Sequence, residues 1–173
     1  SVRNYALELR HRDGRLTSVL YNASVYRDEQ GEAVGVFAAA RDITERKRAE
    51  AAVQAERQRL FDVLESLPAM ICLLNPDYHV TFANRSFREK FGESNGRHCY
   101  EYCYGRNEPC EFCESYNVLK TGQPHHWEVP AADGSVIAAH DLPFTDVDGS
   151  PMILEMDLDI TEQRQAEAAL KEA

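Results

Sequence analysis

The chain has 173 residues and a formal net charge of −10 at pH 7, with 43% hydrophobic and 28% charged residues. This is the composition of an ordinary globular protein, and the excess of acid argues against a nucleic-acid surface, which needs a basic face. No apolar run approaches the roughly 20 residues of a membrane span, and no signal peptide is visible. The opening SVRNYALELR already alternates apolar and polar residues, so we expect a cytoplasmic piece of a longer protein, whose parent could be attached to a membrane.

The first predicted elements are strands around a tight turn at Asp13-Gly14. They end at Asp42-Ile43-Thr44, where a charged helical run begins. Thr44 is predicted to be the N-cap of that helix, with Glu45 favourable in its first turn.

Residues 44–65 are predicted to form a helical linker, because they lack Gly and Pro and are rich in good helix formers. A 4-3-4-3-4 spacing, typical of a coiled-coil seam, relates Ala49, Val53, Glu56, Leu60, Val63 and Leu67. The seam is weak in its first half. We therefore weigh a solvated connecting helix against a dimeric signalling helix, and the context described below favours the second.

Four of the five cysteines lie in the stretch CYEYCYGRNEPCEFC, with the spacing C-x3-C-x6-C-x2-C. They are Cys99, Cys103, Cys110 and Cys113. A short helix is expected to end near Gly92, and another to run from Cys110 to about Lys120 behind Pro109. Two thiolates spaced C-x2-C at a helix N-terminus can chelate one metal, and the helix dipole there lowers the pKa of a thiol.

The last predicted strands flank a turn at Asp148-Gly149. One face of the earlier strand carries Val136, Ala138, His140, Leu142 and Phe144. In the later strand the apolar residues Met152, Leu154, Met156, Leu158 and Ile160 alternate with Ile153, Glu155, Asp157 and Asp159. Period two over nine residues predicts an antiparallel strand, followed by an exit helix from Thr161, a second predicted N-cap, to residue 173.

The end of the chain repeats its beginning, because Asp133-Gly134 matches Asp13-Gly14 and Asp159-Ile160-Thr161 matches Asp42-Ile43-Thr44. Paired Asp-Gly strands that end in Asp-Ile-Thr resemble the C-terminal half of a PAS domain, the PAC motif. LPAMICLLNPDYHVTFANRSFREKFG is similar to the opening of that family, with strands at 70–74 and 79–83 and Asn84 at the start of a helix. The family often has Ala two residues later, where this chain has Ser86.

The resemblance implies an α+β PAS fold, an antiparallel sheet with helices on one face, joined by a long helix to a partial PAS sheet. Residues 66–160 correspond to a complete PAS domain, and residues 1–43 to the last three strands of another. A second copy or a neighbouring helix is predicted to cover the apolar face of the partial sheet, because a free sheet aggregates. That face comprises Val19, Tyr21, Ala23, Val25, Val34, Val36 and Ala38.

The cysteine cluster has several interpretations. A four-thiolate zinc site leads, because closed sites with four cysteine ligands are common. An iron–sulfur cluster would make the domain an oxygen or redox sensor, and a thiol–disulfide switch would pair Cys110 with Cys113. In the simplest interpretation the cysteines are small apolar fillers. His98 could replace one cysteine in a mixed site, whereas His125 and His126 are expected at the surface.

Flavin and haem are not expected. GRNEPCEF differs from the flavin photoreceptor motif, and Glu114 excludes a C-x-x-C-H haem attachment. Cys72 is predicted to be a core residue and Trp127 a core anchor that could also line a cavity.

The resemblance implies a sensory and relay module of a bacterial signal-transduction protein, a sensor histidine kinase or diguanylate cyclase, with no catalytic residues in this fragment. The residues expected to couple strands to helices are Asp42, Thr44, Asp159 and Thr161. The expected partners are a second copy, bound through the linker helices, and a downstream output domain, without nucleic acid or membrane. The alternative is a structural dimerisation module with a cysteine-stapled loop and no ligand.

Overall fold

The computed structural model describes residues 1–172, which divide into two compact units, residues 1–60 and the chain from residue 61 onward. Within the described part of the chain, no helix is both long enough and apolar enough to cross a membrane.

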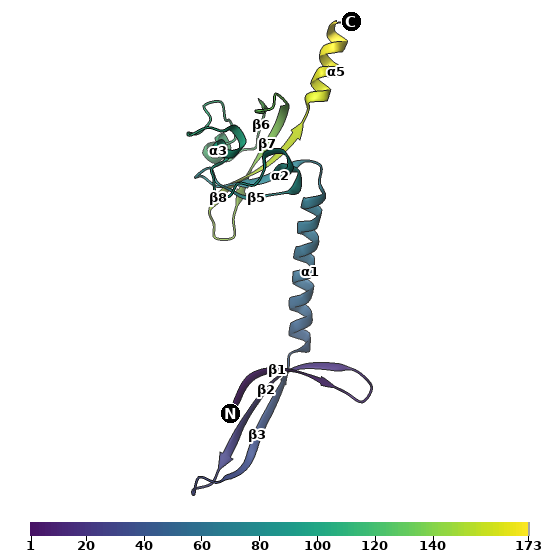
Figure 1. The fold of residues 1–173 in the computed structure, drawn as a ribbon, viewed down its shortest axis with the longest axis vertical. Helices are drawn as coiled ribbons and strands as arrows, with labels where there is room; N and C mark the ends of the chain where they lie inside the picture. Colours follow the sequence, from purple (N-terminus) through teal and green to yellow (C-terminus); the bar gives the residue numbers. More distant parts are fainter. Residues whose placement is uncertain (173) are drawn as a thin grey trace. The chain divides into compact units, whose positions relative to one another are not determined.

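The first unit is a three-stranded antiparallel sheet, visible in purple and blue in Figure 1. Its strands are β1 (Val2–Arg10), β2 (Leu16–Arg27) and β3 (Ala33–Asp42), in the order β1-β2-β3. Val19 is buried, but Val34 and Val36 are 57% and 67% exposed. The apolar face predicted to need a cover is thus largely exposed in the single chain.

Helix α1 (Thr44–Ser66) follows β3 and has no buried residue. Its apolar side chains Val53, Leu60 and Val63 are each about half exposed, at 55%, 53% and 47%. The predicted seam therefore lies open to solvent in the single chain.

The second unit is a five-stranded antiparallel sheet with helices. Its elements are β4 (Met70–Leu74), β5 (Val80–Ala83), α2 (Arg85–Phe91), α3 (Cys99–Tyr104), α4 (Asn117–Thr121), β6 (His125–Pro130), β7 (Val136–Thr145), β8 (Pro151–Asp159) and α5 (Thr161–Glu172). The strand order is β5-β4-β8-β7-β6, so the first and last strands of the unit meet in the middle of the sheet. The predicted α+β fold is confirmed.

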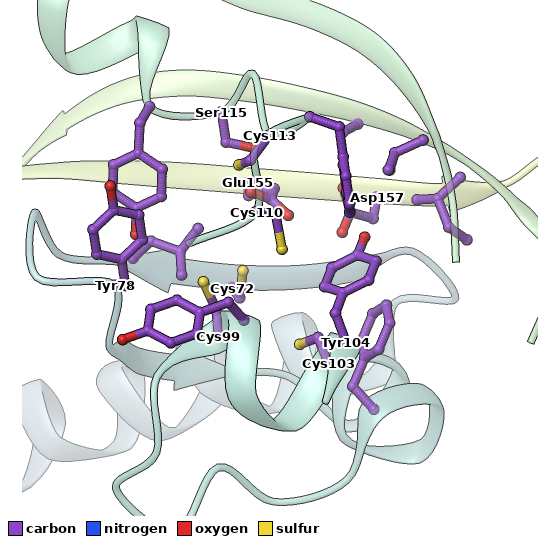
Figure 2. Close-up of a pocket in the computed structure, with 18 of the residues that line it drawn as sticks. Cys72, Tyr78, Cys99, Cys103, Tyr104, Cys110, Cys113, Ser115, Glu155 and Asp157 are labelled. Atoms are coloured by element: carbon purple, nitrogen blue, oxygen red, sulfur yellow. The ribbon is translucent and has the colours of Figure 1, made fainter. Parts of the chain in front are cut away.

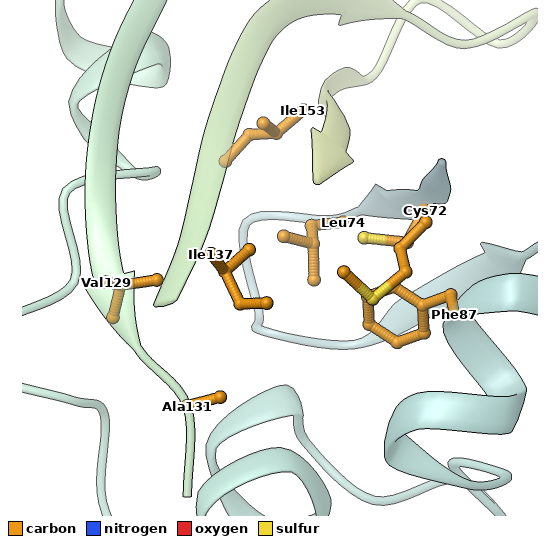
Figure 3. Close-up of a cluster of buried hydrophobic side chains, with 8 residues drawn as sticks. Cys72, Leu74, Phe87, Val129, Ala131, Ile137 and Ile153 are labelled. Atoms are coloured by element: carbon orange, nitrogen blue, oxygen red, sulfur yellow. The ribbon is translucent and has the colours of Figure 1, made fainter. Parts of the chain in front are cut away.

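The core of this unit lies between the sheet and α2 (Figure 3). It comprises Met70, Cys72, Leu74, Phe87, Val129, Ala131, Ile137 and Ile153. Cys72 is 1% exposed, which confirms its prediction as a core residue. Asn84 is fully buried at the start of α2, and its side-chain oxygen accepts hydrogen bonds from the amides of Ile71 and Phe87.

The predicted helix from Cys110 to Lys120 is wrong. Helix α3 lies earlier, from Cys99 to Tyr104, and is followed by Gly105, whose left-handed φ of 63° favours glycine. The chain then makes separate turns, because the Cys113 amide bonds to the Cys110 carbonyl only three residues back. Regular helix resumes only in the five residues of α4.

Candidate functional site

The second unit encloses a cavity of about 60 Å³ between its sheet and the segment from α2 to residue 116 (Figure 2). The sheet contributes residues of β4, β6, β7 and β8, and the helical side contributes α2, α3 and the turns that follow. The lining is mostly apolar and aromatic, with a few thiols and carboxyl groups. The lining is typical of small-molecule sites, although the volume is well below the roughly 300–1,000 Å³ of a drug-sized pocket.

All five cysteines line this cavity. Cys72 comes from β4, Cys99 and Cys103 from α3, and Cys110 and Cys113 from the turns after it. All five are free thiols. The four clustered cysteines thus meet around one cavity, but nowhere in residues 1–172 are three His, Cys, Asp or Glu side chains grouped as metal ligands. The metal site remains a prediction.

Burial raises the pKa of each of these thiols. The pKa of Cys99 rises to about 12, chiefly because the charged form loses solvation. The pKa values of Cys103, Cys110 and Cys113 are also raised by burial. The expectation that a helix dipole lowers the pKa at Cys110 is wrong, because no helix begins there and desolvation dominates.

Three acidic side chains lie together on the cavity side of the sheet, and sequence reasoning missed all three. Glu155 and Asp157 lie two residues apart on the same face of β8 and line the cavity. Asp141 on β7 is directly opposite Glu155 in the strand register. Burial raises the pKa of Asp157 to about 7 and that of Glu155 well above its ordinary range. The polar residues of β8 therefore face the interior, although polar residues of an alternating strand are usually expected to face solvent.

Trp127 on β6 lines the cavity and packs against the core. Its indole Nε1–H donates a 2.9 Å hydrogen bond to Asp141 Oδ2. It is thus a positioning group for a buried acid as well as an apolar anchor.

The histidines lie outside the set of lining residues. His98 directly precedes Cys99 at the start of α3, and its Nδ1 is 2.8 Å from Glu101 Oε2. Its role in a mixed site remains a prediction. His125 pairs with Glu114 at 2.6 Å, and His126 stacks on His140 with ring centroids 4.2 Å apart.

Comparisons with known proteins agree with this architecture. Residues 64–165 match the family described as PAS fold, and residues 1–45 match a second family described as PAS domain. The chain belongs to the PAS family. A comparison with curated proteins finds no match. PAS domains are sensory modules of signal-transduction proteins and have no enzymatic activity of their own.

Solved PAS structures support the fold. The PAS domain of an HTR-like protein from Haloarcula marismortui superposes with a TM-score of 0.52 at 23% identity, over 66% of this chain and 99% of that domain. An RNA-binding light-oxygen-voltage receptor gives a TM-score of 0.50 at 19% identity, over 67% of this chain and 36% of the receptor. Likeness at this identity concerns the fold alone.

The PAS sheet joins its exit helix through a set of hydrogen bonds that the first unit repeats. Thr161 Oγ1 accepts from the Val136 amide at 2.9 Å, as Thr44 Oγ1 accepts from the Ser18 amide at 3.0 Å. The Thr161 and Thr44 amides donate to Asp159 Oδ1 at 3.0 Å and to Asp42 Oδ1 at 2.8 Å.

The prediction that the two threonines are N-caps is therefore wrong. The backbone carbonyl that accepts the first bond of α1 belongs to Ile43, and that of α5 belongs to Ile160. Each threonine is one residue further along the chain, and its hydroxyl binds the neighbouring strand. The helix is thus tied to the sheet at its first residue.

Lys90 on α2 adds a contact to the second junction only. Its Nζ lies 2.7 Å from Asp133 Oδ2 and 3.4 Å from Asp159 Oδ2. Hydrogen bonds from Thr161 lower the pKa of Asp159, and Lys90 lowers it further. Strand β8 therefore runs from the cavity acids directly into an ion-paired helix junction.

Proposed function

We propose that the chain is the sensory and relay part of a bacterial sensor histidine kinase or diguanylate cyclase, with the stimulus acting at the cavity of the second unit. The observation that carries this proposal is the course of β8. Glu155 and Asp157 line the cavity, and Asp159, two residues later, accepts the hydrogen bond that holds Thr161 at the start of α5. A shift of β8 at the cavity is therefore transmitted to the exit helix within two residues.

The cysteines supply the chemistry of the stimulus. Zinc bound by Cys99, Cys103, Cys110 and Cys113 leads, followed by an iron–sulfur cluster and by a disulfide between Cys110 and Cys113. The shared cavity wall supports all three. Each of them requires the raised thiol pKa values to fall or the turns that carry Cys110 and Cys113 to rearrange, because the nucleophile or ligand is the thiolate.

Metal and acid-labile sulfide content of anaerobically purified protein, with an absorbance scan, separates these three. One zinc per chain without colour supports the zinc site, whereas iron with sulfide supports the cluster. Neither metal, with titratable thiols, leaves the disulfide switch. A Cys110→Ser, Cys113→Ser variant should lose the metal, while Cys72→Ala, outside the motif, should retain it.

Amide hydrogen exchange tests the relay itself. We expect exchange in residues 157–170 to change when the thiols are oxidised with diamide or when zinc is added. Residues 40–50 serve as the internal control, because they form the matching junction on a sheet without this cavity. Unchanged exchange of residues 157–170 in every state contradicts the sensory role.

Dimerisation through the linker helices belongs to the same proposal. The half-exposed Val53, Leu60 and Val63 of α1 support it, because apolar side chains at this spacing pair in coiled coils. Sedimentation velocity tests it: Leu60→Glu should shift a dimer to monomer, whereas Gln54→Glu, off the seam, should leave the dimer intact.

A further inference from the structure

The cavity carries acids without a compensating base. Glu155 and Asp157 line it, and no Lys, Arg or His is among the lining residues of the described chain. Asp157 is only 4% exposed, and its Oδ1 is buried without a hydrogen-bond partner in residues 1–172. An uncompensated buried carboxylate is costly, so the site favours a proton or a cation beside it.

The groups around these acids do not supply that cation. The titratable groups that face them are Asp141 on β7, Cys72 on β4, Cys99, Cys103 and Tyr104 on α3, and Cys110 and Cys113 on the turns. All of these are acids, thiols or phenols. Burial raises the pKa of Asp141, which the charge of His125 partly offsets, but His125 is paired with Glu114. Burial likewise raises the pKa of Cys110, which the charge of Arg106 partly offsets, and the Arg106 guanidinium carbon lies 5.8 Å from the Phe112 ring centroid.

The PAC strands do not require acids at these positions. The matched bonds of Thr161 to Val136 and of Thr44 to Ser18 align the two sheets residue by residue. In this alignment Asp141, Glu155 and Asp157 correspond to Ala23, Ala38 and Ala40, and Ala23 is opposite Ala38 just as Asp141 is opposite Glu155. The acids are therefore a feature of the cavity and not of the strand pattern.

Beside the five cysteines and a few aliphatic residues, much of the remaining wall is aromatic. It includes Tyr78, Tyr100, Tyr104, Phe112, Tyr116 and Trp127. Faces of aromatic rings attract cations, most strongly where water is excluded. Aromatic rings beside unpaired carboxyl groups form the kind of pocket that holds an organic ammonium ion.

We propose that the cavity binds a small protonated amine, with its ammonium group against Glu155 and Asp157. The proposal rests on the sensory role of the same cavity and names the class of its ligand. In the free protein burial raises the pKa of both acids, so they hold protons that a bound ammonium group displaces to solvent. The volume of about 60 Å³ limits the ligand to a few non-hydrogen atoms.

Ethylammonium chloride is the probe, with ethanol as the neutral control and sodium acetate as the anionic one. Trp127 is the only tryptophan, and its indole N–H binds Asp141, so its NMR resonance reports occupancy. At pH 8 we expect ethylammonium to shift this resonance with a dissociation constant of about 1 mM, the range for three non-hydrogen atoms. Equal shifts with ethanol, or none with ethylammonium, overturn the proposal.

Asp157→Asn should weaken ethylammonium binding at least about 10-fold, because a charge-assisted hydrogen bond is lost. Asp148→Asn, an exposed acid in the turn between β7 and β8, is the matched control and should bind as the unaltered protein does. Glu155→Gln provides a second test if Asp157→Asn fails to give a dispersed NMR spectrum. Unchanged affinity in the folded cavity variant overturns the proposal.

Exchange of residues 157–170 separates this proposal from the sensory role. Ethylammonium binding without any change in α5 leaves the amine site standing and contradicts the relay. A response of α5 to thiol state or zinc, without ethylammonium binding, retains the relay and overturns the amine site.

Discussion

The two sheets of this chain share the same junction into a helix and differ in what lies above them. In both, a threonine hydroxyl accepts an amide hydrogen bond from the neighbouring strand, and an aspartate accepts one from the threonine amide. In the second unit, α2, α3 and the cysteine turns cover the sheet and enclose a cavity, whereas β3 of the first unit is exposed along its length. The same pattern of turns, strands and helix junction therefore occurs both in a covered sheet with a cavity and in an uncovered one.

The difference shows which residues serve the fold and which serve the cavity. The junction residues Asp42 and Thr44 recur as Asp159 and Thr161, so they belong to the PAC architecture. The cavity acids have alanine counterparts in the first sheet. Substitutions at matched positions should therefore have equal effects at the junctions and unequal effects on the sheet faces.

The largest expected effect is a difference between the two units in the stability lost when an asparagine is replaced by alanine. Asn84→Ala removes two accepted hydrogen bonds and two donated ones, to the carbonyls of Leu64 and Ala69, in a fully buried setting. We expect a loss of at least about 3 kcal/mol in the unfolding free energy of the second unit, followed by Trp127 fluorescence in urea. Asn22→Ala removes one exposed bond to the Asn4 amide and should cost less than about 1 kcal/mol. Equal costs would contradict the contrast.

The second effect concerns the cavity acids and pH. The pKa of Asp157 is about 7 in the folded protein against an ordinary 3.8, so the folded state holds a proton that the unfolded state releases. Stability should therefore fall as the pH rises from about 4 to about 7 and then level off. Asp157→Asn should remove this slope and raise stability at pH 8 by about 1–3 kcal/mol.

The matched substitution for this second effect is Ala40→Asp in the first sheet. It introduces an acid at the corresponding but exposed position, so it should add no comparable pH dependence. Urea unfolding between pH 4 and pH 8 measures both variants. A slope that survives in Asp157→Asn would assign the pH dependence to Glu155 or Asp141.

The repeated turns and junctions could be predicted from sequence because they depend on local chemistry. Asp-Gly turns, period-two strands and the Asp-Ile-Thr ending each have a signature of a few residues, and their duplication indicated the PAS fold. The helix proposed for Cys110 to Lys120 failed because single turns and a continuous helix share composition over such a short stretch. Helix α3 does carry local signals, because Glu101 completes a capping box with His98 and Gly105 follows the last turn.

The cavity acids could not be predicted because the direction of an alternating strand depends on what covers the sheet. In β8 the apolar row includes Leu158, which is 40% exposed, while Asp157 is 4% exposed. Alternation identifies two faces but not which one meets the helices. The alanines at the matched positions of the first copy show only that the repeat does not require acids there, and they do not tell which face is covered.

A third and smaller effect should be equal in the two units. Thr161→Val and Thr44→Val each remove one acceptor, for the amides of Val136 and Ser18. Each should cost about 1 kcal/mol and speed exchange of that amide about 5-fold. Thr161→Ser and Thr44→Ser retain the hydroxyl and should restore protection. A cost confined to one unit would show that the two junctions are not equivalent.

The smallest effect distinguishes the junctions by their charge. Hydrogen bonds from threonine lower the pKa of both Asp42 and Asp159, but Lys90 contributes only to Asp159. Each aspartate therefore adds stability above its ordinary pKa of 3.8, and this stability is lost as the pH falls through the lowered folded pKa. Lys90→Met should move the pKa of Asp159 back toward 3.8 and leave that of Asp42 in place, as followed by carboxyl carbon NMR. If the pKa values of both aspartates changed, Lys90 would be acting on the folded state as a whole. If neither pKa changed, Lys90 would not contribute to the pKa of Asp159, and the second junction would carry no link between α2 and the exit helix.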